Sequence, residues 1–347
     1  MLKEKSGREE LPVFSLHSGT QRLMSVSLPP FQVSPQEAGH TLAKVLRSRL
    51  QGPSWAEVRK LIAARRVQVG DAVCSDEARR LKENEVVVLH AQPKPLPRTA
   101  HPERLVVRHL DEHIVVVEKP AGVNTVRHPA ELEWSEQRRQ LDPTLQDLTQ
   151  WAIAHQLHRA PADLPRLRIV HRLDKETSGL VVFARSALAE RELGQQFRKH
   201  TVIRRYLTVV PGILPARTIT SNLVEDRGDG RRGSTPLPGV GKSATTHITV
   251  EERLPGYTLL SCRLETGRTH QIRIHLSEAG HPVCGDKVYI KKPSGEIFPD
   301  RSEAPRLALH ATELGFIHPA SEASLHWSMP LPLDLQKFLE RLRKTTR

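Results

Sequence analysis

Hydrophobic residues in the first ninety positions follow two different periods. Apolar residues recur every three or four positions over residues 42–50 and again over 55–62, with the breaker Gly52-Pro53 between the two blocks. This spacing predicts two short helices. Residues 67–69 and 85–89 instead alternate or run apolar, as strands do, so a small hairpin should follow the helices.

The rest of the chain combines strand-like and helical patterns over longer stretches. Apolar runs or alternation predict strands over 105–107, 114–117, 202–210 and 257–264, and a strand, a turn and a second strand over 169–184. Apolar residues at helical intervals predict helices over 145–155, 187–199 and 331–343, and a helix or strand-to-helix turn over 269–277. Because the strands recur with separated helices, we predict an α+β fold with a mostly antiparallel mixed sheet and flanking helices.

These patterns divide the chain into four parts. Residues 1–35, rich in charge, Ser and Pro, predict a weakly ordered arm, and residues 36–91 predict a compact α/β module. The prolines of 92–104 predict a semi-rigid linker, and 105–347 form the larger domain. Inside that domain, the glycine-rich stretch 226–242 predicts a mobile loop for recognition, and the charged segment 130–140 is a candidate substrate contact.

The composition favours a polyanionic partner. Lys and Arg exceed Asp and Glu by 13, whereas aromatic residues make up 4% of the chain, too few for a groove built on repeated base stacking. Backbone contact with folded RNA fits this balance better. Three cysteines without a C-x-x-C spacing indicate reduced thiols, and we find neither an apolar leader nor a membrane-length apolar run. We therefore expect a cytoplasmic protein, and a monomer because no exposed apolar stripe is evident.

The segment 171–180, His-Arg-Leu-Asp-Lys-Glu-Thr-Ser-Gly-Leu, concentrates charged and hydroxyl groups between two apolar runs. A polar turn between two strands presents a carboxylate at a cleft, so Asp174 is the residue we expect to carry the chemistry. The alternative is that Asp174 only stabilises the turn by pairing with Arg172 or Lys175. The sequence contains no G-x-G-x-x-G, Walker-type or H-E-x-x-H motif.

This decamer resembles the signature H-R-L-D-x-x-T-S-G-L of the RluA-type pseudouridine synthases. Further stretches resemble the family's other motifs in the same order: 118–123 with His128-Pro129, Arg204-Arg205-Tyr206-Leu207 with Arg204 in place of a lysine, 266–276, 280–286 and 307–311. The resemblance covers residues 105–335. It implies that this domain has the pseudouridine synthase fold and isomerises uridine to pseudouridine in RNA, without a cofactor or a metal ion.

The same resemblance implies roles for individual residues. Asp174 would be the essential carboxylate, paired with the guanidinium fork of Arg273, and Tyr206 would stack on the uracil and assist a late proton removal. Arg172 would fill the space that a flipped base leaves. Whether Asp174 attacks the ribose, attacks the base or abstracts a ribose proton stays open. Further substrate-binding candidates are Arg268, His171, Lys119 and Ile274.

Other residues of these motifs are interpreted as structural. Thr177, Ser178 and Gly179 would shape the turn, and Gly179 would permit a close backbone approach. Arg273 and Arg268 could instead contact phosphates, and Arg172 could hold the loop through a salt bridge. The histidines of these motifs lack the spacing of a helical zinc site, so we expect them to form structural hydrogen bonds: His171, His270, His275, His281 and His310.

The module at 36–91 resembles the S-four-like RNA-binding module shared with a ribosomal protein, through residues 57–62, 65–70 and 81–87. Basic side chains crowd its helical part, and such a face suits phosphate oxygens. The predicted RNA contacts are Arg47, Arg59, Lys60, Arg65 and Arg66. The alternative is a solvated basic surface on a small domain.

Three functions therefore compete. The first is an RNA pseudouridine synthase, with large-subunit rRNA favoured as the substrate and tRNA open. The second is a non-catalytic RNA-binding or ribosome-assembly protein on a synthase scaffold, which would tolerate loss of Asp174, Tyr206 or Arg273. The third is a hydrolase of nucleosides or glycosides, disfavoured because glycosidases usually need two catalytic carboxylates. The intact set of all three residues favours the first function.

Overall fold

The computed structural model describes residues 28–50, 53–70, 72–74, 77, 79–92, 105–131, 133, 139–140, 142–227, 232–290 and 299–344. The chain divides into two compact units: a smaller one, Met1–Leu96 with Glu133–Asp142, and a larger one, Pro97–Leu132 with Pro143–Arg347. Most of the predicted arm (1–27) and of the predicted linker (93–104) lies outside the described residues, as do parts of the segments 130–140 and 226–242.

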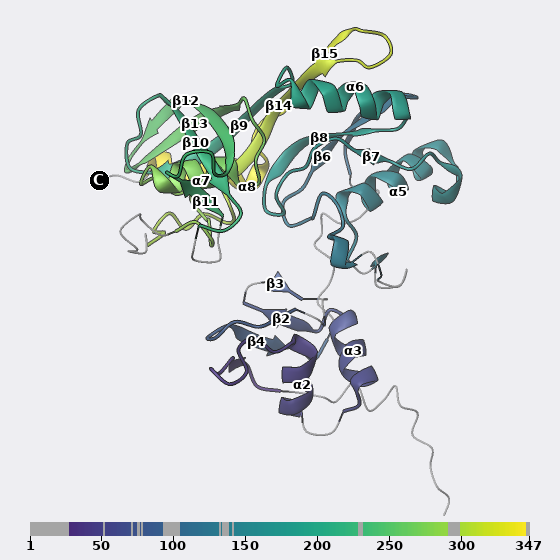
Figure 1. Ribbon diagram of the computed structural model, residues 1–347, viewed down its shortest axis with the longest axis vertical. Helices are drawn as coiled ribbons and strands as arrows, with labels where there is room; N and C mark the ends of the chain where they lie inside the picture. The colour runs from purple at the N-terminus through teal and green to yellow at the C-terminus, as the bar shows by residue number, and fades with distance from the viewer. Residues whose placement is uncertain are drawn as a thin grey trace, which may run out of the picture. The chain divides into compact units, whose positions relative to one another are not determined.

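In the smaller unit, two helices pack on an antiparallel sheet (Figure 1). The helices are α2 (Leu42–Leu50) and α3 (Trp55–Ala63), and the described strands lie in the order β1 (Phe31–Gln32), β4 (Val86–Leu89), β2 (Val67–Val69) and β3 (Ala72–Val73). The predicted helices and hairpin are thus confirmed. Helix α3 begins with a capping box, in which Ser54 and Glu57 satisfy each other's main-chain N–H groups.

Two residues of the predicted weakly ordered arm belong to the sheet of the smaller unit. Phe31 and Gln32 pair with Val87 and Val86, so residues predicted to belong to a weakly ordered arm form an edge strand. A strand of two residues is too short to show an alternating pattern in the sequence. Its half-buried Phe31 packs against the core of the module.

The larger unit is built on one extended sheet. Its described strands lie in the order β11-β10-β12-β13-β9-β14-β8-β6-β5, with β15 paired to β14 and β7 paired to β8. The pair β8–β14 is parallel, and the other described pairs of this sheet are antiparallel. The mixed, mostly antiparallel sheet predicted from the sequence is confirmed. The strands are β5 (Val107–Leu110), β6 (Ile114–Lys119), β7 (Arg168–Ile169), β8 (Ser178–Ala184), β9 (Ile203–Pro211), β10 (Arg217–Val224), β11 (Gly233–Thr235), β12 (Lys242–Leu254), β13 (Tyr257–Leu264), β14 (Leu309–Ile317) and β15 (Ser324–Ser328).

Strands β6 and β8 are buried on both faces, which explains their unbroken apolar runs. Ile114 and Val116 of β6 pack with α6, whereas Val115 and Val117 pack with α5, so the alternation of the strand feeds two separate cores. Helices α5 and α6 accordingly cover opposite faces (Figure 1). The helical segments of this unit are α5 (Leu145–Leu157), α6 (Ala187–Arg198), α7 (Gln271–Glu278), α8 (Leu333–Lys344) and the 3-10 turns η2 (Pro129–Glu131) and η3 (Pro161–Asp163).

Several strands were not predicted. Strands β10 and β12 are rich in Thr, Ser and charged residues, and most of β10 is not buried, so their apolar alternation is weak. Strand β11 lies inside the stretch 226–242 that the sequence assigned to a mobile loop, which is a correction to that prediction. Of the helices described, none is long and apolar enough to cross a lipid bilayer.

Candidate active site

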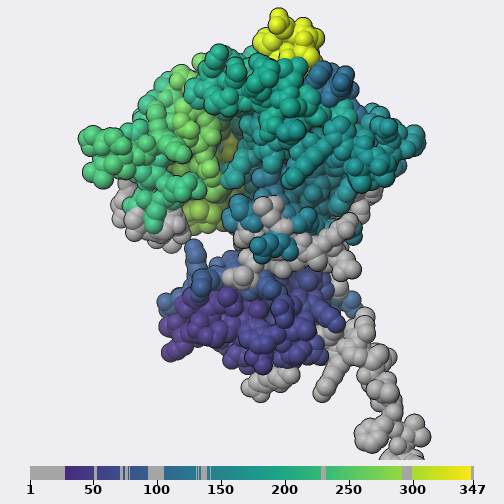
Figure 2. Space-filling model, turned by 45° about the vertical axis from the view of Figure 1, so that its right-hand side comes forward, coloured from purple at the N-terminus to yellow at the C-terminus, as the bar shows by residue number. Residues whose placement is uncertain are grey.

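A cavity of about 770 Å³ opens in the larger unit beside the turn 170–177. Five parts of the chain line it: this turn, α6 with the residues just after it, the start of β9, the segment that leads from β13 into α7, and Leu309 of β14. The surface is hollowed where the teal and green segments of this unit meet (Figure 2). The cavity is within the size range of pockets that enclose a small organic ligand.

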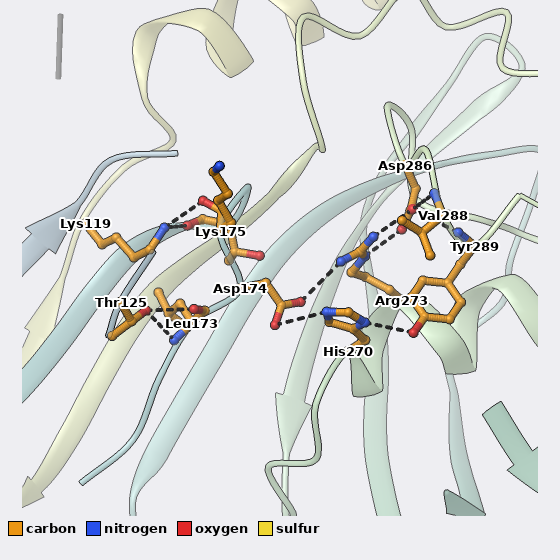
Figure 3. A network of polar contacts seen from close by, with 11 residues as sticks. Lys119, Thr125, Leu173, Asp174, Lys175, His270, Arg273, Asp286, Val288 and Tyr289 are labelled. Atoms are coloured by element: carbon orange, nitrogen blue, oxygen red, sulfur yellow. Dashed lines mark hydrogen bonds and ion pairs between the residues drawn. The ribbon is translucent and has the colours of Figure 1, made fainter. Parts of the chain in front are cut away.

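Asp174 lies on the wall of this cavity, in a turn whose backbone is held by hydrogen bonds from the segment 119–125. The Thr125 hydroxyl donates to the main-chain oxygen of Leu173 at 2.7 Å and accepts from its N–H at 3.1 Å. The main-chain N–H of Gly122 donates to the oxygen of Lys175 at 2.8 Å. These bonds fix the backbone on both sides of Asp174 (Figure 3).

Lys119 makes further hydrogen bonds that hold this turn. Its side chain is 1% exposed, and Nζ donates to the main-chain oxygens of Pro120, Lys175 and Thr177 at 3.0, 2.9 and 2.7 Å. The three donors of an ammonium group match these three acceptors. Burial lowers the pKa of Lys119 to about 7, which nearby carboxylates oppose. Lys119 was predicted to bind substrate, but the structure places its ammonium under the turn instead, where it orders the backbone.

Arg273 links Asp174 to a second, fully buried carboxylate. Its Nη1 lies 3.5 Å from Oδ2 of Asp174, and its Nε and Nη2 donate to the two oxygens of Asp286 at 2.7 and 2.9 Å. The structure therefore brings Arg273 and Asp174 together as predicted, but the bidentate fork binds Asp286. The reason is position, since Asp286 is 0% exposed and lies beside the Nε edge of the guanidinium (Figure 3).

Asp286 is itself held by three donors besides Nε. Its Oδ1 accepts from the main-chain N–H groups of Val288 and Tyr289 as well as from Arg273. Burial alone would raise the pKa of Asp286, yet the hydrogen bonds and charge of Arg273 hold it below its ordinary value. For Arg273, burial is likewise outweighed by the two carboxylates, and its pKa is raised. The guanidinium is thus a permanent cation next to Asp174.

His270 and Tyr289 complete the surroundings of Asp174. Nε2 of His270 lies 3.8 Å from Oδ1 of Asp174, and its Nδ1 is hydrogen-bonded to the Tyr289 hydroxyl at 2.8 Å. Burial lowers the pKa of His270, so the ring is neutral near pH 7. His270 adopts a left-handed backbone at the start of α7, with φ of 60°. This conformation turns its ring toward the cavity and away from the helix.

Tyr206 lies on β9 with its ring in the core and one edge on the cavity. Burial raises the pKa of its hydroxyl to about 12; the charge of Arg204 lowers that pKa and the charge of Asp174 raises it further. The phenol is therefore protonated at neutral pH. It offers a flat apolar surface and a hydrogen-bond donor next to Asp174.

The remaining substrate-binding candidates differ in their exposure and contacts. Arg172 and Arg268 are exposed side chains on the cavity, and His171 lines it while stacked on Phe197 with ring centroids 4.6 Å apart. No carboxylate or hydrogen-bond partner of the Arg172 side chain occurs in the described part of the chain, which leaves no support for a salt bridge that holds the loop. Nε of Arg268 donates to the main-chain oxygen of Ser243 at 3.1 Å.

Ile274 does not reach the cavity. It is completely buried in a small cluster with Leu223, Ala244 and Tyr289, so the predicted contact of Ile274 with substrate is wrong. Residues 271–277 of α7 are all buried, so this stretch of the helix has no solvent-exposed face. Ile274 packs into the cluster, whereas Arg273 points to the cavity.

The motif histidines form the expected structural hydrogen bonds. Nε2 of His171 accepts from the main-chain N–H of Val182 at 3.1 Å, and burial together with Arg204 lowers its pKa to about 3, so this ring is neutral. His275 bridges Ser221 and Thr246, His281 contacts the main-chain oxygen of Pro211, and His310 contacts Ser178.

In the smaller unit, the five predicted basic contacts differ in exposure. Arg47, Arg59 and Lys60 are exposed, and the Arg47 guanidinium lies 4.6 Å from the centre of the Trp55 ring. Arg65 and Arg66 are instead buried, at 7% and 5%, and Nε of Arg66 donates to the main-chain oxygen of His90 at 2.8 Å. These two arginines therefore stabilise the module from inside, which corrects the prediction of an RNA contact.

Sequence reasoning did not assign roles to Asp286, Tyr289 or Thr125, and it assigned His270 only a structural hydrogen bond. Asp286 stood inside a quoted motif, and a lone acidic residue among apolar and glycine residues could have marked it as a buried partner for an arginine. Tyr289 and Thr125 carry no such signal, because their contacts with His270 and Leu173 exist only in the folded chain.

Comparison with known proteins gives consistent matches. A family model described as RNA pseudouridylate synthase matches residues 113–278. The protein named ribosomal large subunit pseudouridine synthase D from Nitrosomonas europaea is 39% identical over 241 residues, 67% of this chain and 64% of that protein. Its namesake from Xanthomonas campestris pv. campestris is 36% identical over 298 residues, 80% of this chain and 83% of that protein.

A solved structure agrees at the level of the fold. The structure named human RNA pseudouridylate synthase domain containing 4 has a TM-score of 0.54 and 24% identity, covering 68% of this chain and 92% of that one. The span matched by the family model runs from β6 through α7 and so contains Asp174, Tyr206 and Arg273. By sequence, and in agreement with its fold, this chain belongs to the RNA pseudouridine synthase family.

Proposed function

We propose that Asp174 is the essential carboxylate with which this protein isomerises specific uridines of structured RNA. The observation that carries the proposal is the position of Asp174 on the cavity wall, in a turn fastened by Lys119 and Thr125 and next to the permanent cation of Arg273. In the reaction, uracil leaves C1 of the ribose, turns and rejoins through its C5, so no outside reactant is required. One positioned carboxylate is enough to begin it.

Arg273 would act through charge and geometry. Because Asp286 occupies two of its N–H groups, the guanidinium cannot swing away, and Nη1 stays directed at Asp174. A cation held in this way favours a transition state in which charge moves on or off the neighbouring carboxylate.

Tyr206 would stack on the detached uracil and take part in the late removal of the C5 proton. Since its pKa is about 12, the hydroxyl starts protonated. To accept the C5 proton it must pass its own proton on, and Asp174, which raises this pKa through its charge, is the adjacent acceptor. As C5 loses its proton, N1 of the uracil gains one, so the base ends neutral and Asp174 gives up the proton that it received.

A uridine in a helix must leave its stack before Asp174 can reach it. Arg172 follows β7 at the mouth of the cavity, exposed and two residues before Asp174. We infer that this side chain occupies the space of the flipped base, as the family resemblance implied. Its long flexible stem and permanent charge suit a site between phosphate-lined strands.

We infer that the substrate is large-subunit rRNA. Two relatives with 39% and 36% identity carry that substrate in their names. The exposed basic residues of the smaller unit, which we propose to be an S-four-like RNA-binding module, fit a large folded RNA better than a small molecule. We further infer that the protein acts as a monomer, which light scattering on the purified chain would test.

The substrate proposal is tested with RNA from a strain that lacks this gene. Purified rRNA and tRNA fractions would be incubated with the protein, and new pseudouridines mapped by chemical labelling and primer extension. We expect new sites in large-subunit rRNA and none in tRNA. New sites in tRNA alone would overturn the rRNA assignment, and none in either fraction would overturn the activity.

A further inference from the structure

Arg204 is a buried cation on the wall of the Asp174 cavity that no described carboxylate neutralises. Its residue is 7% exposed and lies two positions before Tyr206 on β9, so both side chains point to the same face of the strand. Nη2 donates to the main-chain oxygens of Leu264 and Glu265 at 3.5 and 2.9 Å. Nε is buried and has no hydrogen-bond partner in the described part of the chain.

The neighbours of Arg204 do not supply a negative charge. The Phe197 ring lies 5.6 Å from its guanidinium carbon, His171 is neutral, and the Tyr206 hydroxyl is protonated. Asp174 on the same cavity wall is already paired with Arg273. Buried charges in proteins are normally paired, because an unpaired charge loses its hydration without compensation. The missing anion is therefore expected to come from the ligand that fills the cavity.

Gly267 leaves room for the Arg204 guanidinium on the wall of the cavity. A Cβ at Gly267 would lie 2.6 Å from Nη1 of Arg204, so glycine lets the guanidinium rest against that backbone without shifting. Arg198 and His200 line the same cavity. Acidic Glu190 also lines the cavity, but it is paired with Arg168 at 2.7 Å.

We propose that Arg204, with Arg198 and His200 of the same cavity, binds a phosphodiester group that flanks the target uridine and so positions that nucleotide over Asp174. This subsite rests on the proposed function, since only a nucleic-acid substrate brings an anion at every residue. A phosphodiester fits better than a uracil carbonyl because the base is uncharged and would leave Arg204 unneutralised. Because Nη2 is already bonded to main-chain oxygens, Arg204 offers the phosphate its positive charge and its unpartnered Nε.

The test replaces single phosphates by uncharged methylphosphonates. Oligonucleotides carrying the mapped uridine would have the substitution on its 5′ side, on its 3′ side or at neither position. In the wild-type protein we expect one of the two to weaken binding roughly 10-fold, the loss of one charge-assisted contact. In Arg204→Gln the unmodified RNA should bind about 10-fold more weakly. The methylphosphonate should then cost nothing more, and the slope of log K against log salt should fall by roughly 0.7.

Arg205→Gln is the matched control. Arg205 follows on the same strand but is paired with Glu251 and Glu313 at 2.7 and 2.6 Å, away from the cavity. This variant should keep the full methylphosphonate effect. If Arg204→Gln is too unstable to assay, Arg204→Lys retains a cation and should keep sensitivity at the same phosphate.

Two results would overturn the subsite. One is an equal methylphosphonate effect in wild type and Arg204→Gln, and the other is no effect at either flanking phosphate in any protein. Turnover of the unmodified oligonucleotide by the wild type separates these failures from failure of the proposed function. Turnover without coupling contradicts the subsite alone, whereas no turnover contradicts the activity on which it rests.

Discussion

At the scale of single residues, the site is a row of alternating charges, Asp174–Arg273–Asp286, set into the wall of a cavity. The sequence could indicate the first two members, because each stands in a dense polar motif. It could not indicate that Asp286 takes the fork of Arg273, since that depends on how the chain after α7 folds back. The consequence is that Arg273 is oriented by a carboxylate that never meets the substrate.

Replacing Asp286 by asparagine is expected to leave a buried, half-unpaired guanidinium. We predict a loss of about 3 kcal/mol in the free energy of unfolding at pH 7 and a fall in kcat, because Arg273 is then free to turn toward Asp174. Denaturant unfolding and single-turnover kinetics would measure the two effects. Asp334→Asn, which removes a half-exposed carboxylate paired with Arg306, should cost much less.

The stability difference should also depend on pH. The folded-state pKa of Asp286 lies below the ordinary value of 3.8, so its ionisation stabilises the fold above that pH, and the benefit is lost as the pH falls through the folded-state pKa. Wild type and Asp286→Asn should therefore converge in stability below about pH 4. A constant difference from pH 7 to pH 3 would contradict this assignment.

At the scale of elements, the strand–turn–strand predicted over 169–184 is present, with β7 and β8 on either side of the turn that carries Asp174. Sequence patterns could specify these strands because they are apolar and regular. They could not reveal that the turn is fastened by the end of β6 and the loop after it, through Lys119 and Thr125, since those contacts join residues about fifty positions apart.

Lys119→Met should weaken the hold on the turn, because the main-chain oxygens of Lys175 and Thr177 in the turn and of Pro120 lose their donor. We expect kcat to fall by roughly 100-fold through misplacement of Asp174, with the RNA dissociation constant nearly unchanged. Lys175→Met, which alters an exposed lysine of the same turn, is the control and should keep kcat. A loss of RNA affinity in Lys119→Met with unchanged kcat would show that the ammonium contacts RNA.

Gly179 sets the spacing between β8 and β14. A Cβ there would lie 2.2 Å from the main-chain oxygen of Ala311, and φ is +129°, which confirms the expected close backbone approach. Gly179→Ala should destabilise the protein by about 3 kcal/mol or more, as measured by denaturant unfolding. Gly280→Ala, at φ of +87° with open space around the Cβ, separates backbone strain from the clash and should cost less. Equal losses would argue against the clash.

At the scale of the whole molecule, some basic residues behind the net charge of +13 are buried and others face solvent. A few of its basic residues lie inside the fold, since Arg65, Arg66, Lys119, Arg204 and Arg273 are buried. Composition reports a sum and cannot distinguish such residues from those that face solvent. For the same reason the sequence indicated two units and a mostly antiparallel sheet but missed β10 and β12, whose stability comes from pairing with neighbours and not from an apolar pattern of their own.

The exposed basic residues of the smaller unit should contribute to RNA binding and not to folding. Arg59→Glu combined with Lys60→Glu is expected to weaken RNA binding and to lower the slope of log K against log salt by roughly 1.5. The melting temperature should stay unchanged. Arg66→Gln should do the reverse, because a buried donor to His90 is lost. Unaltered RNA affinity in the double variant would support a merely solvated basic surface.

The central claim is that Asp174 performs chemistry on uridine. The most direct measurement is tritium release from RNA labelled at C5 of uracil, comparing the wild type with Asp174→Asn, with RNA binding measured on the same samples. We predict release by the wild type, a loss of at least about 1,000-fold in the variant and RNA affinity within a few-fold of the wild type. Release by Asp174→Asn at the wild-type rate would contradict the account, and so would tight RNA binding without release by either protein.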